Sequence, residues 1–404
     1  MLGSPLGRRS ILRAATWTVA LGAAGWRLGW RAARPDFASL RDDFDPTEAL
    51  RESCRAWSEN HDNAAVAVGW IRDGQAEFAG FGKAETISNG PAARIEPPRA
   101  DSIFEIGSIS KVFTGLLLAH AVETDGVALD EPFALLLPEE IRDAWKLPTF
   151  EGVPFTPRHL ATHTSGLPRL GGDVLVASVS SSNPYQNATE ASLVRLLPHL
   201  KLLSRPGERH LYSNLGVGML GHGLARRAGC TYGALLDRVI VGPLGMSDTV
   251  ASTASNDQRP DPTRRVVGRK RDGTPASFWD FDVYDGAGGI RSTLADLIRF
   301  AQAHLEGLEN PKAPLASAIR RATSSWFVIE PQHAEVGLNW FRRLPAADDK
   351  HGVFFLWHNG ETGGFRSFLG IRPDRRAAVV LLMARADPSL EPSCVRFLET
   401  LEWH

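Results

Sequence analysis

The chain has 404 residues, of which 43% are apolar and 23% charged, an ordinary composition for a soluble globular protein. This excludes a disordered or fibrous protein. Lys and Arg together number 45 and Asp and Glu 46, so the chain lacks the basic surplus of a protein that binds nucleic acid without sequence preference. We therefore expect no nucleic-acid partner.

The first 35 residues differ in character from the rest. Three arginines within 8–13 precede an uncharged apolar run over 14–26, which is shorter than the roughly 20 residues needed to span a bilayer. A basic start before a short apolar run is typical of a secretory signal, and 8–13 is similar to the bacterial twin-arginine type. We therefore expect export to the periplasm or the cell exterior, with 1–35 as a signal-like segment. The alternative is an uncleaved anchor or a terminal helix, and we expect membrane association only through this segment.

The N-terminal part of the remaining chain shows both helix and strand patterns. Pro46 to His61 has the pattern of a helix, and Ala64 to Phe81 that of two strands joined by a hairpin turn at Asp73-Gly74. Ser102 to Ile106 is a further strand-like run. These elements precede a long region of different character.

The middle of the chain is dominated by helical periodicity. The predicted helices are Ser110–Glu123, Thr189–Leu203, Leu215–Ala228, Tyr232–Val241 and Thr293–Leu305. Near the C-terminus the pattern returns to strands, followed by a helix; these runs are 353–357, 365–372, 377–383 and 393–401. We therefore predict an α+β fold in which an antiparallel sheet, built from 45–107 and 350–404, is flanked by terminal helices. We also predict that a mostly helical region of about 110–345 is inserted into this sheet domain. Residues 36–404 would then form one catalytic domain.

Ser108 and Lys111 form the first candidate for chemistry. Residues three apart on a helix share a face, so Lys111 would lie beside the Ser108 hydroxyl at a helix N-terminus, whose free N–H groups favour an oxyanion. The lysine must have a lowered pKa to act as a base. Ser-x-x-Lys occurs about once by chance in a chain of this length, so the position after a strand and before a helix is what supports a catalytic role over a simple helix cap.

Tyr212 and Asn214 form the second candidate, just before a helix rich in small residues. A phenol can pass a proton to a leaving group, and a side-chain amide can hold a substrate amide. Tyr185 and Asn187 have the same spacing, but they lie in a polar loop with no such helix behind it. We therefore favour Tyr212; the alternative for either copy is a surface-loop tyrosine with a turn-forming asparagine.

His358, Asn359 and Gly360 form the third candidate, at the end of an apolar strand. Gly360 permits close approach of the backbone, and the N–H of Glu361 could complete an oxyanion hole with that of Ser108. We expect His358 to offer a hydrogen bond or a positive charge to a substrate carboxylate. A strand-end histidine before a flexible glycine turn is the alternative.

Together these motifs, in this order, resemble those of the serine β-lactamase and penicillin-binding-protein family. The likeness is to class C β-lactamases and the related D,D-carboxypeptidases and esterases, and it covers nearly all of 37–404. Supporting stretches lie at 104–115, 160–168, 243–246 and 286–289. The resemblance implies the corresponding fold and a serine hydrolase.

Position by position, the resemblance implies that Ser108 is acylated, that Lys111 and Tyr212 share proton transfer, and that Asn214 orients the substrate. His358 and Gly360 take the third motif, where class C β-lactamases usually have Lys-Thr-Gly. A histidine there also occurs in some peptidases and esterase-like relatives, which argues against efficient cephalosporin hydrolysis.

The resemblance implies a small-molecule or peptidoglycan-peptide substrate, β-lactams or D-Ala-terminated peptides, and we expect a monomer. Two other functions stay open: an esterase on small acyl esters, and a non-hydrolytic penicillin-binding protein. The side chain of Glu361 would place a negative charge where an anionic substrate approaches, and this favours the esterase.

No sequence pattern indicates a cofactor or a metal. His159 and His163 are four residues apart, but no glutamate completes the zinc-protease motif. The α/β-hydrolase elbow Gly-x-Ser-x-Gly is also lacking. Cys54, Cys230 and Cys394 match no metal or redox spacing, so we expect small buried apolar residues at these positions.

Overall fold

The computed structural model describes residues 44–86, 95–253, 261–331, 333–345 and 353–401. The chain divides into two compact units, Met1–Asp45 and Pro46–His404, and every element below belongs to the second. The signal-like segment lies outside the described residues. Within them, no helix has the length and apolar character that a membrane span requires.

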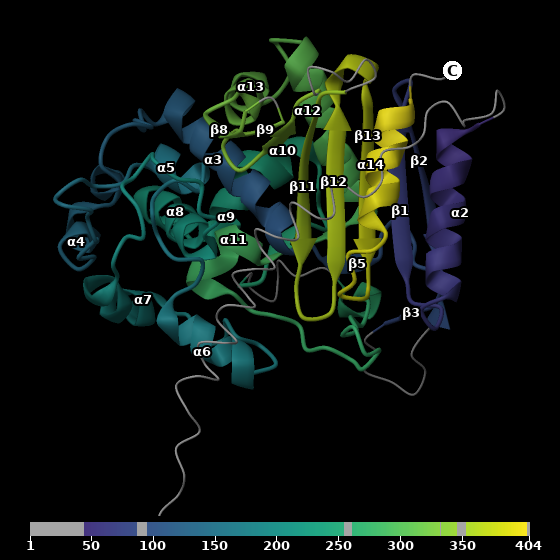
Figure 1. Cartoon of the computed structure of the whole chain (residues 1–404), viewed down its shortest axis with the longest axis horizontal. Coiled ribbons are helices and arrows are strands. Elements are labelled where there is room, and N and C mark those ends of the chain that lie inside the picture. The colour runs from purple at the N-terminus through teal and green to yellow at the C-terminus, as the bar shows by residue number, and fades with distance from the viewer. Residues whose placement is uncertain (1–43, 87–94, 254–260, 332, 346–352, 402–404) are drawn as a thin grey trace, which may run out of the picture. The chain divides into compact units, whose positions relative to one another are not determined.

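Eight antiparallel strands form the main sheet, in the order β2-β1-β13-β12-β11-β10-β9-β8 (Figure 1). Both ends of the chain supply its first five strands: β1 Val66–Arg72, β2 Gln75–Phe81, β11 Phe355–Glu361, β12 Arg366–Arg372 and β13 Ala377–Met383. In the pairing of β1 with β13, Val66 lies opposite Met383. The α+β prediction, with a sheet built from both termini, is confirmed.

The turn between β1 and β2 is the predicted hairpin. Asp73 and Gly74 have φ values of 52° and 75°, and positive φ at both central residues is what this tight turn requires. Glycine adopts such angles without a steric cost.

Helices cover both faces of the sheet. On one face lie α2, Pro46–Glu59, and α14, Glu391–Thr400; on the other lies α12, Leu294–Glu309 (Figure 1). Helix α2 buries Leu50, Cys54 and Trp57, which share one face at helical spacing. Because both faces are covered, all seven residues of β13 are buried.

The strand prediction was incomplete. Three short strands from the region predicted as helical extend the main sheet: β8 Phe327–Glu330, β9 Ala334–Val336 and β10 Phe341–Arg343. Strand β5, Ile103–Glu105, is not in that sheet but pairs with β7, Ile290–Thr293, in a smaller one that also contains β6, Val250–Ala251. Strands of two to four residues are too short to show a clear alternation in the sequence.

The helical region surrounds α3, Ser110–Thr124, whose residues are buried on all sides over most of its length. Helices α8, Asn214–Arg227, and α13, Ala316–Thr323, pack against it. The other helices of this region are α4 Glu139–Arg142, α5 Pro157–Ala161, α6 Gly172–Ser180, α7 Glu190–Leu196, α9 Tyr232–Leu236, α10 Gly242–Leu244 and α11 Asp285–Gly288. A helix apolar all round belongs in a core, and the predicted nucleophile, Ser108, lies in the turn just before α3.

One predicted helix was too long. The helix expected over Thr189–Leu203 ends at Leu196 and is followed by a 3₁₀ turn at Leu197–His199. Pro198 lacks the N–H that would continue the α-helical hydrogen bonds, which accounts for the early end.

The cysteines are all free thiols. Cys54 and Cys394 are buried, on α2 and α14, as expected. The prediction was wrong for Cys230, which is half-buried because it follows the end of α8 in a turn.

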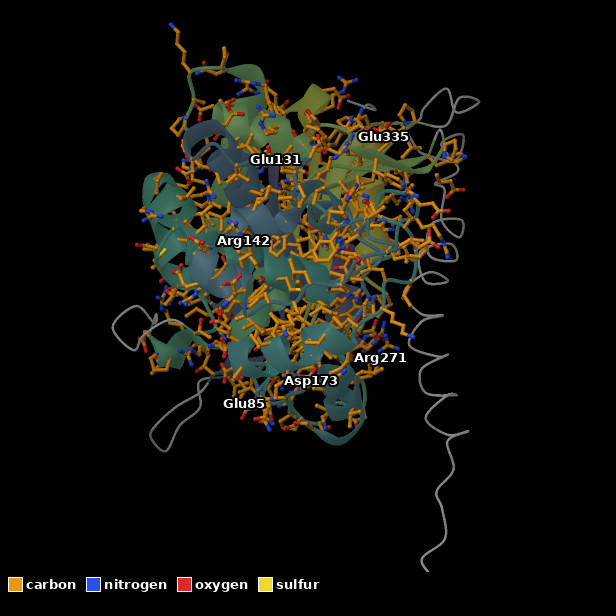
Figure 2. All side chains as sticks on the ribbon, turned by 90° about the vertical axis from the view of Figure 1, so that its left-hand side faces the viewer. Glu85, Glu131, Arg142, Asp173, Arg271 and Glu335 are labelled. Carbon is orange, nitrogen blue, oxygen red and sulfur yellow. The ribbon has the colours of Figure 1, made fainter. Side chains whose placement is uncertain are left out.

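Acidic and basic side chains share the surface. Figure 2 shows both kinds, among them Glu131, Arg142 and Arg271, over the same side of the molecule. This mixture agrees with the formal net charge of −1.

Candidate active site

Ser108 lies in a tight turn between β5 and α3. The turn is the 3₁₀ segment Gly107–Ile109, and the hydroxyl of Ser110 fixes it by donating to the Gly107 carbonyl over 2.7 Å and accepting from the N–H of Ile290 over 3.0 Å. Ser108 is half-buried, whereas its neighbours in the turn are fully buried. The structure therefore presents this one side chain to the solvent side.

Lys111 is fully buried beneath Ser108. Its Nζ lies 2.9 Å from the Ser108 Oγ and 2.6 Å from the carbonyl oxygen of Ala287. Burial, followed by the positive charge of Arg169, holds the pKa of Lys111 well below its usual value. A neutral amine can accept the proton of the serine hydroxyl, which a charged ammonium cannot.

Tyr212 lies against the same two residues. Its ring centroid is 4.9 Å from the Lys111 Nζ, and its hydroxyl hydrogen bonds with Ser108. Burial raises the pKa of Tyr212 to about 12, so the phenol keeps its proton at neutral pH. The adjacent Ser213 caps α8 by accepting from the N–H of Gly216 over 2.9 Å, which fixes the chain just after Tyr212.

Asn214, the first residue of α8, extends the site. Its Nδ2 donates to the hydroxyl of Tyr185 over 3.0 Å, and its Oδ1 is buried without a hydrogen-bond partner in the described part of the chain. A free carbonyl oxygen at this position can accept an N–H of a substrate.

Tyr185 is not the surface-loop residue that its polar neighbours in the sequence suggested. It is 5% exposed, and its ring stacks on Phe281 at 4.4 Å between centroids. The prediction failed because the aromatic partners are nearly one hundred residues away in the sequence. Tyr212 is the copy that the structure brings to Ser108, and Tyr185 supports Asn214 from behind.

The third motif lies in β11, which runs to Glu361 and so extends past the predicted end of the strand at Trp357. A Cβ on Gly360 would lie 2.0 Å from the carbonyl oxygen of Ile106, and one on Gly107 would lie 2.6 Å from the backbone nitrogen of Glu361. Only glycine permits this approach. It places the end of β11 directly against the turn that carries Ser108.

His358 does not carry the positive charge that was one expectation. It is 1% exposed, and burial, followed by the charge of Lys111, lowers its pKa to about 3. Its Nδ1 lies 2.6 Å from the carbonyl oxygen of Asn359 and donates to it, so Nε2 holds the lone pair. The imidazole is therefore neutral at physiological pH, and the expectation of a cation here was wrong.

The carboxylate of Glu361 is balanced by a neighbouring cation. Arg366 forms ion pairs with both Glu361 and the half-buried Glu391. The amide of Asn359 also donates to Glu391, over 3.0 Å. The expected repulsion of an anionic substrate by Glu361 is thus offset locally.

Glu105 is a site residue that the sequence analysis did not single out. It is buried, and its two oxygens accept from the backbone N–H of Trp279 over 2.6 Å and from the Thr362 hydroxyl over 2.7 Å. Burial raises its pKa to about 7, against the opposing effect of Arg291. Its partners are 174 and 257 residues away, and only its place in a buried strand next to the nucleophile marked it in the sequence.

His159 and His163 have structural partners. The Nδ1 of His159 accepts from the N–H of Thr156 over 3.3 Å, and the Nδ1 of His163 accepts from the N–H of Ser213 over 3.2 Å. Within the described ranges, no three or more His, Cys, Asp or Glu side chains form a cluster that could hold a metal.

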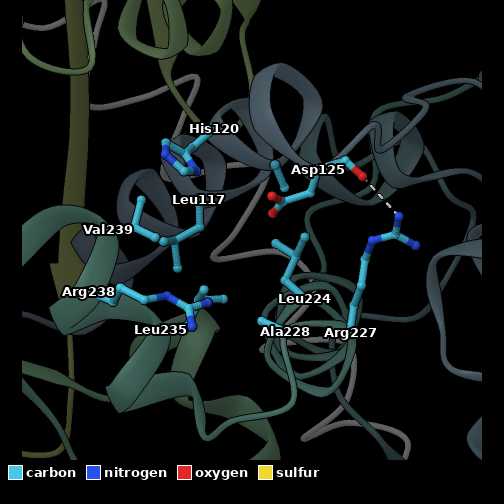
Figure 3. A pocket seen from close by; sticks show the side chains of 10 residues that line it. Leu117, His120, Asp125, Leu224, Arg227, Ala228, Leu235, Arg238 and Val239 are labelled. Carbon is cyan, nitrogen blue, oxygen red and sulfur yellow. Dashed lines mark hydrogen bonds between the residues drawn. The ribbon is translucent and has the colours of Figure 1, made fainter.

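A separate cavity of about 240 Å³ lies at the far end of α3, as Figure 3 shows. Leu117, His120 and Leu224 are among its lining residues. None of the residues that line this cavity belongs to the three motifs around Ser108, so the cavity is not part of the site described above.

Comparison with known proteins identifies the family. Residues 47–397 match the family model described as Beta-lactamase. The D-alanyl-D-alanine-carboxypeptidase/endopeptidase AmpH of Escherichia coli (strain K12) is 28% identical over 300 residues, which are 72% of each chain. A beta-lactamase of Pseudomonas fluorescens is 22% identical over 357 residues, covering 82% of this chain and 92% of the relative.

Solved structures agree on the fold. A class C beta-lactamase superposes with a TM-score of 0.72 at 18% identity, covering 90% of this chain and 98% of that one. The D-alanine carboxypeptidase AmpC of Burkholderia cenocepacia gives 0.68 at 23% identity, covering 88% and 98%. The chain belongs to the Beta-lactamase family, and it is a serine hydrolase with the α+β fold of that family.

Proposed function

We propose that the protein forms an acyl-enzyme on Ser108 and hydrolyses β-lactams or D-Ala-terminated peptides. The observation that carries this is the 2.9 Å contact between the Ser108 Oγ and a fully buried Lys111 whose pKa is lowered. A serine hydroxyl beside a neutral amine is an activated nucleophile.

The proton path follows from the two pKa shifts. Lys111 takes the proton of Ser108 as its Oγ attacks the substrate carbonyl, and the N–H groups of Ser108 and Glu361 hold the oxyanion. Tyr212 donates its proton to the leaving nitrogen and regains one from Lys111. Water then attacks the ester on Ser108, which releases the acid and restores the hydroxyl.

The unpartnered Oδ1 of Asn214 supports a substrate with an N–H near the scissile carbonyl. Acylamino β-lactams and peptides carry such a group, whereas small acyl esters do not. The names of the bacterial relatives, a D-alanyl-D-alanine-carboxypeptidase/endopeptidase and a beta-lactamase, agree with this class.

We infer that the protein acts as a monomer outside the cytoplasm, where peptidoglycan peptides and β-lactams are found. The basic and then apolar start of the chain supports export. Fractionation of cells that express the full chain, compared with a variant in which Arg8 and Arg9 are both lysine, tests the export route. Loss of the exported form in the variant is the expected result.

Three substrates separate the possible activities. We expect turnover of nitrocefin, or D-Ala release from a pentapeptide that ends in D-Ala-D-Ala, and neither with Ser108→Ala. Turnover of a 4-nitrophenyl ester alone would assign an esterase instead. Acylation by penicillin without turnover would assign a penicillin-binding protein.

A further inference from the structure

Three of the cations around Ser108 have a lowered pKa or are already paired with carboxylates. Lys111 has a lowered pKa, and Arg366 forms ion pairs with two glutamates. Arg291 lies between Glu105 and Asp280, at 4.0 and 2.9 Å. None of these three is available to hold an anionic group of a substrate.

Arg169 is different. It is exposed, and its guanidinium carbon lies 5.2 Å from the ring centroid of Tyr212. Among the residues that the structure describes, no carboxylate forms an ion pair with it. Arg169 therefore places an unneutralised positive charge over the ring of the proposed proton donor.

The backbone holds Arg169 at this position. Its carbonyl oxygen accepts from the N–H of Asn214 over 2.9 Å and from that of Leu215 over 3.3 Å. The same hydrogen bonds join it to the start of α8, where Asn214 faces the site. The contact with Tyr212 holds the guanidinium over the aromatic face, so less freedom is lost when a ligand binds.

We propose that Arg169 binds a carboxylate of the substrate and makes the enzyme selective for anionic substrates. This rests on the proposed acyl-enzyme function and assigns the recognition of charge to a residue outside the three motifs. The guanidinium offers paired N–H donors to a carboxylate, and the neutral His358 offers no charge. Because Arg169 is exposed, water screens the interaction and the effect is moderate.

Two pairs of substrates test the proposal, each matched in size and differing in one carboxylate. The first pair is 4-nitrophenyl butyrate and 4-nitrophenyl hydrogen succinate, which differ in the acyl half. The second is the benzoylglycyl thioester of ethanethiol and that of mercaptoacetate, which differ in the leaving group. Wild type, Arg169→Gln, Arg169→Lys and the exposed control Arg195→Gln are compared by kcat and KM.

In at least one pair, we expect Arg169→Gln to lower kcat/KM of the anionic member about tenfold, mainly through KM, and that of the neutral member less than about threefold. Arg169→Lys should restore part of the preference, and Arg195→Gln should leave it unchanged. The affected pair shows which half of the substrate carries the carboxylate. Any change in the protonation of Lys111 alters kcat/KM of both members alike, so it cancels in the ratio of the anionic to the neutral kcat/KM.

An equal change in both members of both pairs, or no change, would overturn the proposal while leaving the acyl-enzyme function intact. If Arg169→Gln does not fold, the wild type still gives a test, because added salt should lower kcat/KM of the anionic member only. A wild-type protein that hydrolyses none of the four compounds would contradict the proposed function itself.

Discussion

Burial shifts the pKa of three titratable side chains around Ser108. Lys111 has a pKa well below its usual value, Tyr212 one of about 12 and His358 one of about 3. At neutral pH the phenol therefore keeps its proton and the imidazole is neutral, while burial favours the neutral amine of Lys111. The base and the acid that acylation requires are thus on different residues.

The pH dependence tests this assignment. We expect kcat/KM to rise with pH as Lys111 loses its proton, which gives the pH profile an acid limb. His358→Asn should leave the midpoint of this acid limb in place, because the pKa of His358 is about 3 and its imidazole is neutral at higher pH. A midpoint that moves by more than about one pH unit in the variant would show that His358 is the titrating group.

The two tyrosines should respond very differently to the loss of a hydroxyl. Tyr212→Phe removes the proton donor, and we expect kcat/KM to fall by about 10² to 10⁴. Tyr185→Phe keeps the stacked ring and removes only the acceptor for the Asn214 amide, so a loss of about tenfold is expected. Steady-state kinetics on one β-lactam measures both losses. A larger loss in Tyr185→Phe than in Tyr212→Phe would assign the proton transfer to Tyr185.

At the scale of elements, the site depends on how β11 meets the turn before α3. Gly107 and Gly360 allow the two backbones to touch, and the hydroxyl of Ser367 donates to the Ile106 carbonyl over 2.8 Å across the same junction. The Glu361 N–H is placed by this contact rather than by its own side chain.

Gly360→Ala should separate the strand from the turn. The new Cβ would lie 2.0 Å from the Ile106 carbonyl oxygen, so we expect a loss of about 1–3 kcal/mol in the free energy of unfolding and about a hundredfold in acylation rate. Gly172→Ala, where nothing lies within 4 Å of the new Cβ, is the matched control. Denaturant titration and acylation kinetics would contradict this account if both variants behaved alike.

The sequence predicted long elements well and short ones poorly. Ala377–Met383 was predicted with its observed bounds, and the helix at Ser110 differs by one residue at its end. Strands β8 to β10 were missed because three or four residues carry no measurable periodicity. The three motifs were found because each is local in sequence, whereas the roles of Glu105, Tyr185 and Arg169 depend on contacts between distant segments.

At the scale of the whole molecule, buried polar contacts join segments that the chain separates widely. Glu105 is the clearest case, since it ties β5 to the segments at Trp279 and Thr362 that border the site. Such a carboxyl costs stability when it ionises, because water no longer solvates it.

Glu105→Gln tests this cost. The folded pKa of about 7 is above the ordinary value of 4.5, so the contribution of Glu105 to stability is full below pH 4.5 and is lost as the pH rises to 7. The variant is always neutral and keeps an oxygen for the Trp279 N–H. Its free energy of unfolding relative to wild type should therefore improve between pH 4 and 8, by about 3 kcal/mol at most. Chemical unfolding at both pH values gives this difference, and a difference independent of pH would contradict it.

Intact-mass spectrometry during incubation with benzylpenicillin tests whether Ser108 is acylated with Lys111 as its base. We expect one covalent penicilloyl group, on the peptide that contains Ser108, which decays as the hydrolysed product accumulates. The adduct should be absent from Ser108→Ala and should form at least about a thousandfold more slowly in Lys111→Ala. An adduct that persists in Ser108→Ala, or equal rates in Lys111→Ala and wild type, would contradict the account.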